Sequence, residues 1–193
     1  MDIVNEIGQN LFMKKLAPLS ALAVLALVAA PVQAALQEGA TAPTFVANGA
    51  MAGKPITFDL AQALKKGPVV LYFFPAAFTP GCNIEAQMFA EAIPDFERAG
   101  ATVIGVTQGN IDQLEDFSSR HCAGKFPVAA ASDAMKRAYD VEMKRPDGTS
   151  AGVTDRTTFV IAPNGKIILT YSDLKPNDHI TKSLAAVRAL KQG

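Results

Sequence analysis

Residues 69–88 read Val-Val-Leu-Tyr-Phe-Phe-Pro-Ala-Ala-Phe-Thr-Pro-Gly-Cys-Asn-Ile-Glu-Ala-Gln-Met, and this stretch decides the fold. Its first six residues, Val69–Phe74, form an apolar run long enough for a strand that is buried on both faces. Pro75 ends that strand, and residues 79–81 (Thr-Pro-Gly) are typical of a turn. Apolar residues then recur at helical spacing through Phe96, so the sequence predicts one thiol, Cys82, at the start of a helix that follows a central strand.

This position changes the chemistry expected of Cys82. The first turn of a helix has unpaired N–H groups and a partial positive charge, and both favour an anion. An ordinary thiol is only about 3% thiolate at pH 7, whereas a helix start plus a nearby cation lowers a thiol pKa by roughly one to several units. The alternative is a small buried hydrophobic residue, the usual fate of a lone cysteine. Thr79 adds a hydroxyl that can donate to the sulfur or to an oxygen bound near it.

Pro75, Thr79 and Cys82 match the Pro-x-x-x-Thr-x-x-Cys motif of the peroxiredoxins. Residues 73–75 (Phe-Phe-Pro) and 79–82 (Thr-Pro-Gly-Cys) are most similar to the PrxQ, or bacterioferritin comigratory protein, branch. The resemblance extends from about Gly39 to the end of the chain. It implies a thioredoxin-like α/β fold, with a mixed central sheet flanked by helices on both faces. It also implies that Cys82 is a peroxidatic cysteine, which attacks the O–O bond of a hydroperoxide, and that Pro75 walls the cysteine pocket besides ending the strand.

The resemblance extends to Arg156, which precedes a strand at Thr157–Ile161. In the peroxiredoxins an arginine just before this strand reaches the peroxidatic sulfur. A guanidinium keeps its charge when buried, so Arg156 would stabilise the thiolate and polarise the leaving oxygen. From the sequence alone, an arginine paired with Asp155 or with solvent is the alternative.

Cys122 is the candidate resolving cysteine. Many PrxQ proteins carry the resolving cysteine five residues after the peroxidatic one, but Gln87 occupies that position here. Other members resolve from the next helix, and Cys122 lies at the predicted end of that helix. We therefore expect a Cys82–Cys122 disulfide, which would require both helix ends to unwind because the Cα atoms must approach within about 7 Å. The alternative is a one-cysteine enzyme that an external thiol resolves.

The first 34 residues predict a targeting segment rather than part of the fold. Lys14 and Lys15, an apolar stretch over 16–30 and Val-Gln-Ala at 32–34 form a secretory signal peptide, with Met13 as a possible start. The apolar stretch is short for a membrane span, although an uncleaved anchor is the alternative. We expect a periplasmic domain at 35–193, without stable membrane association after cleavage.

Along that domain we expect helices at 60–66, 82–98, 110–121, 132–139 and from 177 or 178 onward, and strands at 56–58, 69–74, 101–107, 126–130, 156–161 and 166–171. Pro94 should bend or divide the second helix, Asn110 and Gln113 should form a capping box, and residues 142–155 should be a loop.

The composition excludes several other functions. Eighteen basic and eighteen acidic residues cancel, so there is no basic stripe for nucleic acid. Two cysteines are too few for a disulfide scaffold, and His121 and His179 read as ordinary helix-terminal residues, so we expect no metal and no cofactor.

The sequence thus predicts a peroxidase of hydrogen peroxide and organic hydroperoxides, monomeric or weakly dimeric, reduced by a thioredoxin-like or other thiol donor. A thiol–disulfide oxidoreductase is a rival, but Thr79 fills the first cysteine position of its Cys-x-x-Cys motif. A non-enzymatic metal carrier or redox-responsive binding partner is a further alternative.

Overall fold

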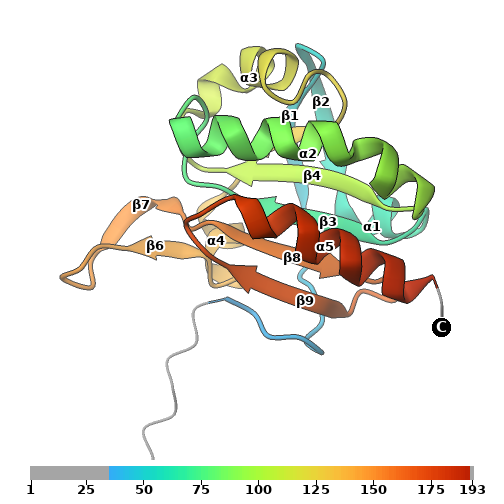
Figure 1. Ribbon diagram of the computed structural model, residues 1–193. Helices are drawn as coiled ribbons and strands as arrows, with labels where there is room; N and C mark the ends of the chain where they lie inside the picture. Colours follow the sequence, from blue (N-terminus) through green and yellow to red (C-terminus); the bar gives the residue numbers. More distant parts are fainter. Residues whose placement is uncertain (1–34, 192–193) are drawn as a thin grey trace, which may run out of the picture. The chain divides into compact units, whose positions relative to one another are not determined.

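The computed structural model describes residues 35–191, which form a mixed β-sheet with helices on both faces (Figure 1). The seven strands lie in the order β2-β1-β5-β4-β3-β8-β9, and β6 and β7 form a separate two-stranded hairpin. The strands are β1 (Val46–Met51), β2 (Lys54–Asp59), β3 (Val69–Phe73), β4 (Thr102–Thr107), β5 (Val128–Ala130), β6 (Glu142–Lys144), β7 (Ser150–Thr154), β8 (Thr157–Ile161) and β9 (Ile167–Ser172). The helices are α1 (Leu60–Leu64), α2 (Pro80–Arg98), η1 (Ile111–Gln113), α3 (Leu114–Arg120), α4 (Asp133–Ala138) and α5 (Asn177–Leu190).

The quoted stretch builds the middle of this sheet. All five residues of β3 are buried, as expected for a strand covered on both faces. β3 pairs in parallel with β4 and antiparallel with β8, and α2 makes the crossover between β3 and β4. The predicted βαβ unit is therefore confirmed, and the start of α2 lies at the carboxyl end of the central strand.

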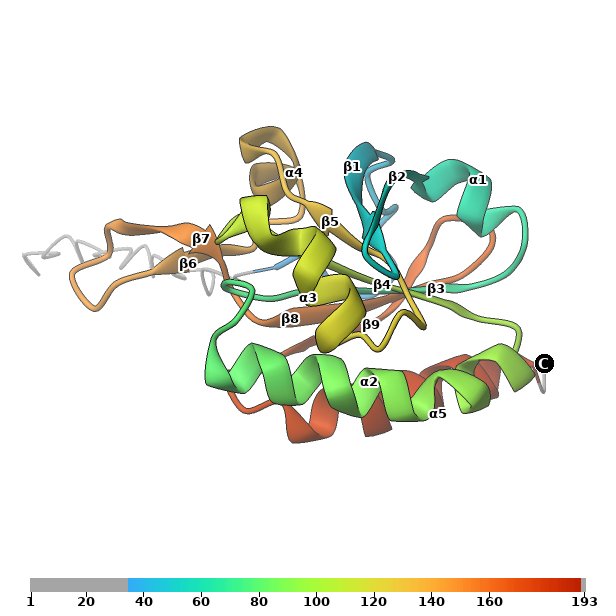
Figure 2. The same cartoon turned by 90° about the horizontal axis from the view of Figure 1, so that it is seen from above.

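Two apolar clusters cover the two faces of the sheet. The first packs α2, α3 and α5 through Phe89, Phe117 and Val187, and it includes both cysteines. The second packs α1 and α4 through Leu60 and Met135. Figure 2 shows α2 and α5 side by side on one face, with α1 and α4 on the other. The predicted fold class is confirmed.

Most predicted elements are present, within a few residues of the expected bounds. The antiparallel pair β8–β9 and the short helix α4, capped by Ser132 through its bond from Met135 N, are as predicted. Pro94 does not divide α2, which runs unbroken from Pro80 to Arg98. The α5 helix begins at Asn177 with Pro176 before it.

Two expectations were wrong, and one strand was missed. Residues 142–155 are not a loop but mostly the β6–β7 hairpin, which projects from the body of the domain (Figure 1). The strand β1 was missed, because its Ala, Asn and Gly residues carry little strand propensity and pairing with β2 and β5 supplies the stability instead. Asn110 forms no capping box: its backbone is left-handed at φ 56°, and its side chain donates to the Ala77 carbonyl.

Candidate active site

Hydrogen bonds from the ends of β7 and β4 hold the loop that carries the chain from β3 to α2. The Thr154 hydroxyl at the end of β7 donates to the Phe74 carbonyl at 2.6 Å. On the other side, the Thr107 hydroxyl at the end of β4 donates to the Pro75 carbonyl at 3.0 Å. A Cβ at Gly109 would lie 2.5 Å from that same carbonyl oxygen, so only glycine allows this approach. Polar groups far away in sequence thus fix the position of Pro75.

The helix α2 begins at Pro80, so Cys82 is its third residue and lies in the first turn, as the sequence predicts. Pro80 is favoured there because its missing N–H would have no partner in the helix. Thr79 is the N-cap, but its hydroxyl donates to the Ala76 carbonyl at 3.0 Å and not to the sulfur. The Cys82 side chain is only 1% exposed.

Arg156 lies between β7 and β8 and is 4% exposed. Its Nη2 lies 3.4 Å from Cys82 Sγ, and its Nε donates to the Leu174 carbonyl at 2.9 Å. A Cβ at Gly81 would lie 3.1 Å from the same Nη2, so the glycine leaves room for the guanidinium. The guanidinium makes these contacts instead of the pairing with Asp155 or solvent that was the alternative. The structure therefore brings Cys82 and Arg156 together across 74 residues of sequence.

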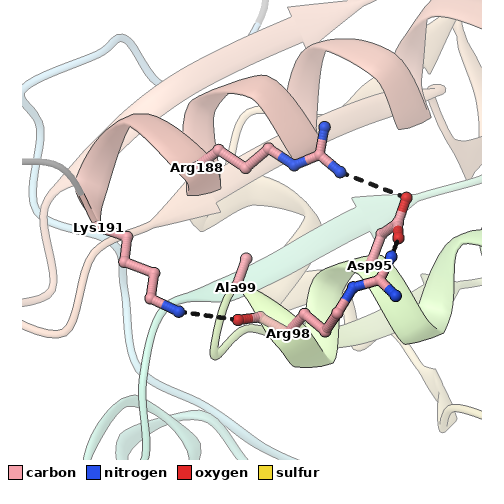
Figure 3. Close-up of a pocket in the computed structure, with 5 residues that line it drawn as sticks. All are labelled: Asp95, Arg98, Ala99, Arg188 and Lys191. Carbon is pink, nitrogen blue, oxygen red and sulfur yellow. Dashed lines mark hydrogen bonds and ion pairs between the residues drawn. The ribbon is translucent and has the colours of Figure 1, made fainter.

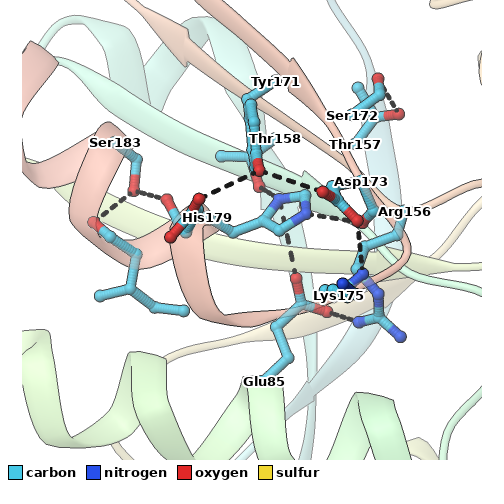
Figure 4. Close-up of polar contacts among 12 residues, drawn as sticks. Glu85, Arg156, Thr157, Thr158, Tyr171, Ser172, Asp173, Lys175, His179 and Ser183 are labelled. Atoms are coloured by element: carbon cyan, nitrogen blue, oxygen red, sulfur yellow. Dashed lines mark hydrogen bonds and ion pairs between the residues drawn. The ribbon is translucent and has the colours of Figure 1, made fainter.

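Glu85 is a member of this cluster that the sequence analysis did not single out. Its carboxyl group is fully buried and accepts a hydrogen bond from Arg156 Nη1 (Figure 4). Burial raises the pKa of Glu85 to about 8, although the Arg156 charge opposes the rise. A signal was present, because residues three apart on a helix share a face and Glu85 follows Cys82 by three.

Cys122 is a fully buried free thiol in the same apolar cluster as Cys82, and both cysteines of the chain are reduced in the described residues. It follows α3, where its N–H donates to the Phe117 carbonyl at 3.3 Å. Burial raises the pKa of the Cys122 thiol well above its usual range. Cys122 is therefore part of the core in this state.

The two histidines differ from each other. His121 is the C-cap of α3, a helix-terminal residue as expected. His179 lies in the first turn of α5 but is fully buried, with hydrogen bonds to Thr158 and to the Asp173 carbonyl, so it is not an ordinary surface residue. Within residues 35–191, no three His, Cys, Asp or Glu side chains gather as a metal site would require. Over the same residues, no helix combines the length and apolar character that a membrane span needs.

A charged hollow of about 250 Å³ lies between the carboxyl ends of α2 and α5 (Figure 3). Asp95 pairs there with both Arg98 and Arg188, and Lys191 donates to the Arg98 carbonyl. At 1.5 Å per residue, the helix places this hollow roughly 20 Å or more from Cys82. Cys82 is not among the residues that line it, so this hollow is separate from the reactive thiol.

Comparison with known proteins identifies the family of the chain. The model of the AhpC/TSA family matches residues 39–170. Peroxiredoxin Bcp of Xanthomonas campestris is 31% identical over 146 residues, which cover 69% of this chain and 91% of that relative. The chloroplastic Peroxiredoxin Q of Sedum lineare is 30% identical over 159 residues, covering 82% of this chain and 81% of that relative.

Solved structures of peroxiredoxins have the same fold as this chain. Peroxidoxin BcpB of Mycobacterium tuberculosis superposes with a TM-score of 0.68 at 29% identity, over 80% of this chain and 98% of that one. Peroxiredoxin Q of Xanthomonas campestris superposes with a TM-score of 0.64 at 28% identity, over 74% and 89%. The chain is thus a peroxiredoxin of the AhpC/TSA family, similar to the Bcp and PrxQ proteins, with the thioredoxin-like fold and the thiol-dependent peroxidase activity of that family.

Proposed function

We propose that Cys82 is the peroxidatic cysteine and that Arg156 activates it. The contact of Arg156 Nη2 with Cys82 Sγ at 3.4 Å carries this proposal. A guanidinium and the first turn of α2 both stabilise an anionic sulfur, and the thiolate is the nucleophilic form of cysteine.

The reaction begins when the thiolate attacks one oxygen of the hydroperoxide. The sulfur–oxygen bond forms as the O–O bond breaks, Cys82 becomes a sulfenic acid, and the other oxygen leaves as water or an alcohol after taking up a proton. Arg156 is placed to stabilise the charge on the departing oxygen. Thr79 turns its hydroxyl from the Ala76 carbonyl toward the bound peroxide, and Pro75 walls the pocket.

Cys122 then resolves the sulfenic acid. Its thiol condenses with the sulfenic acid of Cys82, a water molecule leaves, and an internal disulfide forms. Because Cys122 is fully buried in the reduced protein, the first turn of α2 and the segment after α3 must open for the two sulfurs to meet. A thioredoxin-like dithiol donor then reduces the disulfide. The burial of Cys122 also supports the second candidate, a one-cysteine cycle in which an external thiol resolves Cys82 directly.

Residues 1–34 lie outside the described part of the chain, and their role as a signal peptide is a proposal from sequence. It implies export of 35–193 to the periplasm, as a monomer or weak dimer. The mass of the mature chain from a periplasmic extract, and light scattering of the purified domain, test these two points.

The catalytic proposal is tested by mixing the reduced domain rapidly with one equivalent of hydrogen peroxide and counting remaining thiols. We expect wild type to lose two thiols, Cys122→Ser to lose one and stop at a sulfenic acid, and Cys82→Ser to lose none on the same timescale. If wild type also stops after losing one thiol, the one-cysteine cycle is correct; if Cys82→Ser still consumes peroxide rapidly, the proposal fails.

A further inference from the structure

Two acidic groups, the Cys82 thiol and the Glu85 carboxyl, contact the single positive charge of Arg156. One arm of its guanidinium contacts Cys82 Sγ and the other pairs with one oxygen of Glu85. The second oxygen, Glu85 Oε1, is buried and has no hydrogen-bond partner among residues 35–191. With the sulfur and the carboxyl both ionised, one positive charge would face two negative charges in the interior. A buried charge left uncompensated costs several kcal/mol, so this arrangement requires one more proton.

His179 lies beside the orphaned oxygen. Its Nε2 is 2.8 Å from the Asp173 carbonyl, which can only accept, so Nε2 carries a hydrogen. In the neutral ring Nδ1 is then an acceptor, and it lies 2.8 Å from Thr158 Oγ1 and 3.9 Å from Glu85 Oε1 (Figure 4). The Thr158 hydroxyl donates to the single Nδ1 lone pair of the neutral ring. At 3.9 Å the ring and Glu85 Oε1 are too far apart for a hydrogen bond, so the neutral ring offers an ionised Glu85 no donor.

We propose that Glu85 holds one proton beside the neutral ring of His179, and that this proton leaves the Arg156 charge to the Cys82 thiolate. His179 is then a positioning residue that acts through Glu85, and Glu85 acts through the guanidinium. This inference rests on the proposed role of Cys82.

The direction of ionisation follows from the surroundings of Glu85. Burial raises the pKa of Glu85 to about 8 and lowers the pKa of His179 to about 4, so the proton resides on Glu85 at neutral pH. Above about pH 8 Glu85 loses it and competes with Cys82 for Arg156. The Tyr72 hydroxyl from β3 faces the same groups, but burial raises its pKa well above the usual value and it stays neutral.

The groups around His179 have opposing effects on its pKa. Burial, and to a lesser extent the Arg156 charge, lower the pKa of His179, while the hydrogen bond to the Asp173 carbonyl and the carboxylates of Asp173 and Asp178 raise it less. Tyr171 packs against the ring with centroids 4.7 Å apart. A proton leaving Glu85 therefore meets a ring that is only weakly disposed to take it, and the pair releases it to solvent.

The direct test is a titration by nuclear magnetic resonance of the reduced protein, with labelled glutamate carboxyls and histidine ring nitrogens. We expect Glu85 to be protonated at pH 7 and to titrate near pH 8, with the His179 Nδ1 resonance moving at the same midpoint. In Glu85→Gln the His179 resonance should lose that step. In His179→Gln, whose amide can still donate to the Asp173 carbonyl, the Glu85 midpoint should fall by about one pH unit, a tenfold loss of proton affinity. The control His121→Gln, at the other histidine of the chain, should not move it.

The second readout is the rate of peroxide reduction against pH. Wild type should slow above about pH 8, Glu85→Gln should show no such slowing, and in His179→Gln the slowing should begin about one unit lower. A Glu85 carboxyl ionised at pH 7 in wild type, or a His179 resonance that ignores its titration, would overturn the inference even if both variants failed to fold. Because the titration needs no peroxide, failure of the catalytic proposal would appear separately, as a Cys82 that does not react.

Discussion

Replacing Arg156 with methionine removes the positive charge at the reactive sulfur while keeping much of the side-chain volume. A hydrogen bond to a charged group contributes about 1.5–3 kcal/mol, and Nη2 is 3.4 Å from Cys82 Sγ. Since each 1.36 kcal/mol corresponds to a factor of ten in rate, we expect peroxide reduction at pH 7 to slow roughly tenfold to 150-fold. Arg156→Lys keeps the charge but cannot place two arms on Cys82 and Glu85 together, so it should fall between methionine and wild type.

The assay is rapid mixing with hydrogen peroxide, acid quenching and measurement of the remaining peroxide, because the chain has no tryptophan to report by fluorescence. The matched control is Arg188→Met, which removes an exposed arginine of α5 that pairs with Asp95 in the charged hollow. The control should react at the wild-type rate. A folded Arg156→Met protein that also reacts at the wild-type rate would refute the view that the guanidinium activates the thiol.

The raised pKa and full burial of Cys122 predict that its thiol is alkylated slowly in the reduced folded protein and quickly in urea. Peptide mass spectrometry measures both alkylation rates, and equal rates would contradict the burial of Cys122 in the core. Thr154→Val removes the 2.6 Å hydrogen bond to the Phe74 carbonyl and should lower the free energy of unfolding by about 1–3 kcal/mol in urea denaturation, with slower peroxide reduction; an unchanged midpoint would show that the loop needs no such support. Gly105→Ala places a Cβ 2.6 Å from the Tyr72 ring and should cost about 1–3 kcal/mol by the same assay, whereas a neutral effect would mean that the ring can move aside.

The sequence predicted the parts of the fold that depend on local pattern. The apolar run of β3 and the turn before Cys82 are dictated by neighbouring residues, so their place in the chain could be read directly. The β6–β7 hairpin could not, because its strands are polar and short and form mainly by pairing with each other. The same holds for β1, which gains its stability from partners on both sides.

The candidate site was predicted only in part. The resemblance to peroxiredoxins predicted that Arg156 contacts the Cys82 sulfur, and the spacing of the residues alone could not predict this contact. The Glu85–His179 contact joins residues that are 94 positions apart in the sequence. The residues next to His179 in the sequence give no sign that its side chain is buried. The supports of Pro75 from Thr107 and Gly109 also arise from the neighbouring strand in space, and a single sequence does not display them.

The most direct measurement is the mass of the reduced Cys122→Ser protein after reaction with one equivalent of hydrogen peroxide, with the modified peptide located. We expect one added oxygen on Cys82, in a form that a sulfenic acid reagent captures. Peroxide that disappears while Cys82 remains an unmodified thiol would contradict the account.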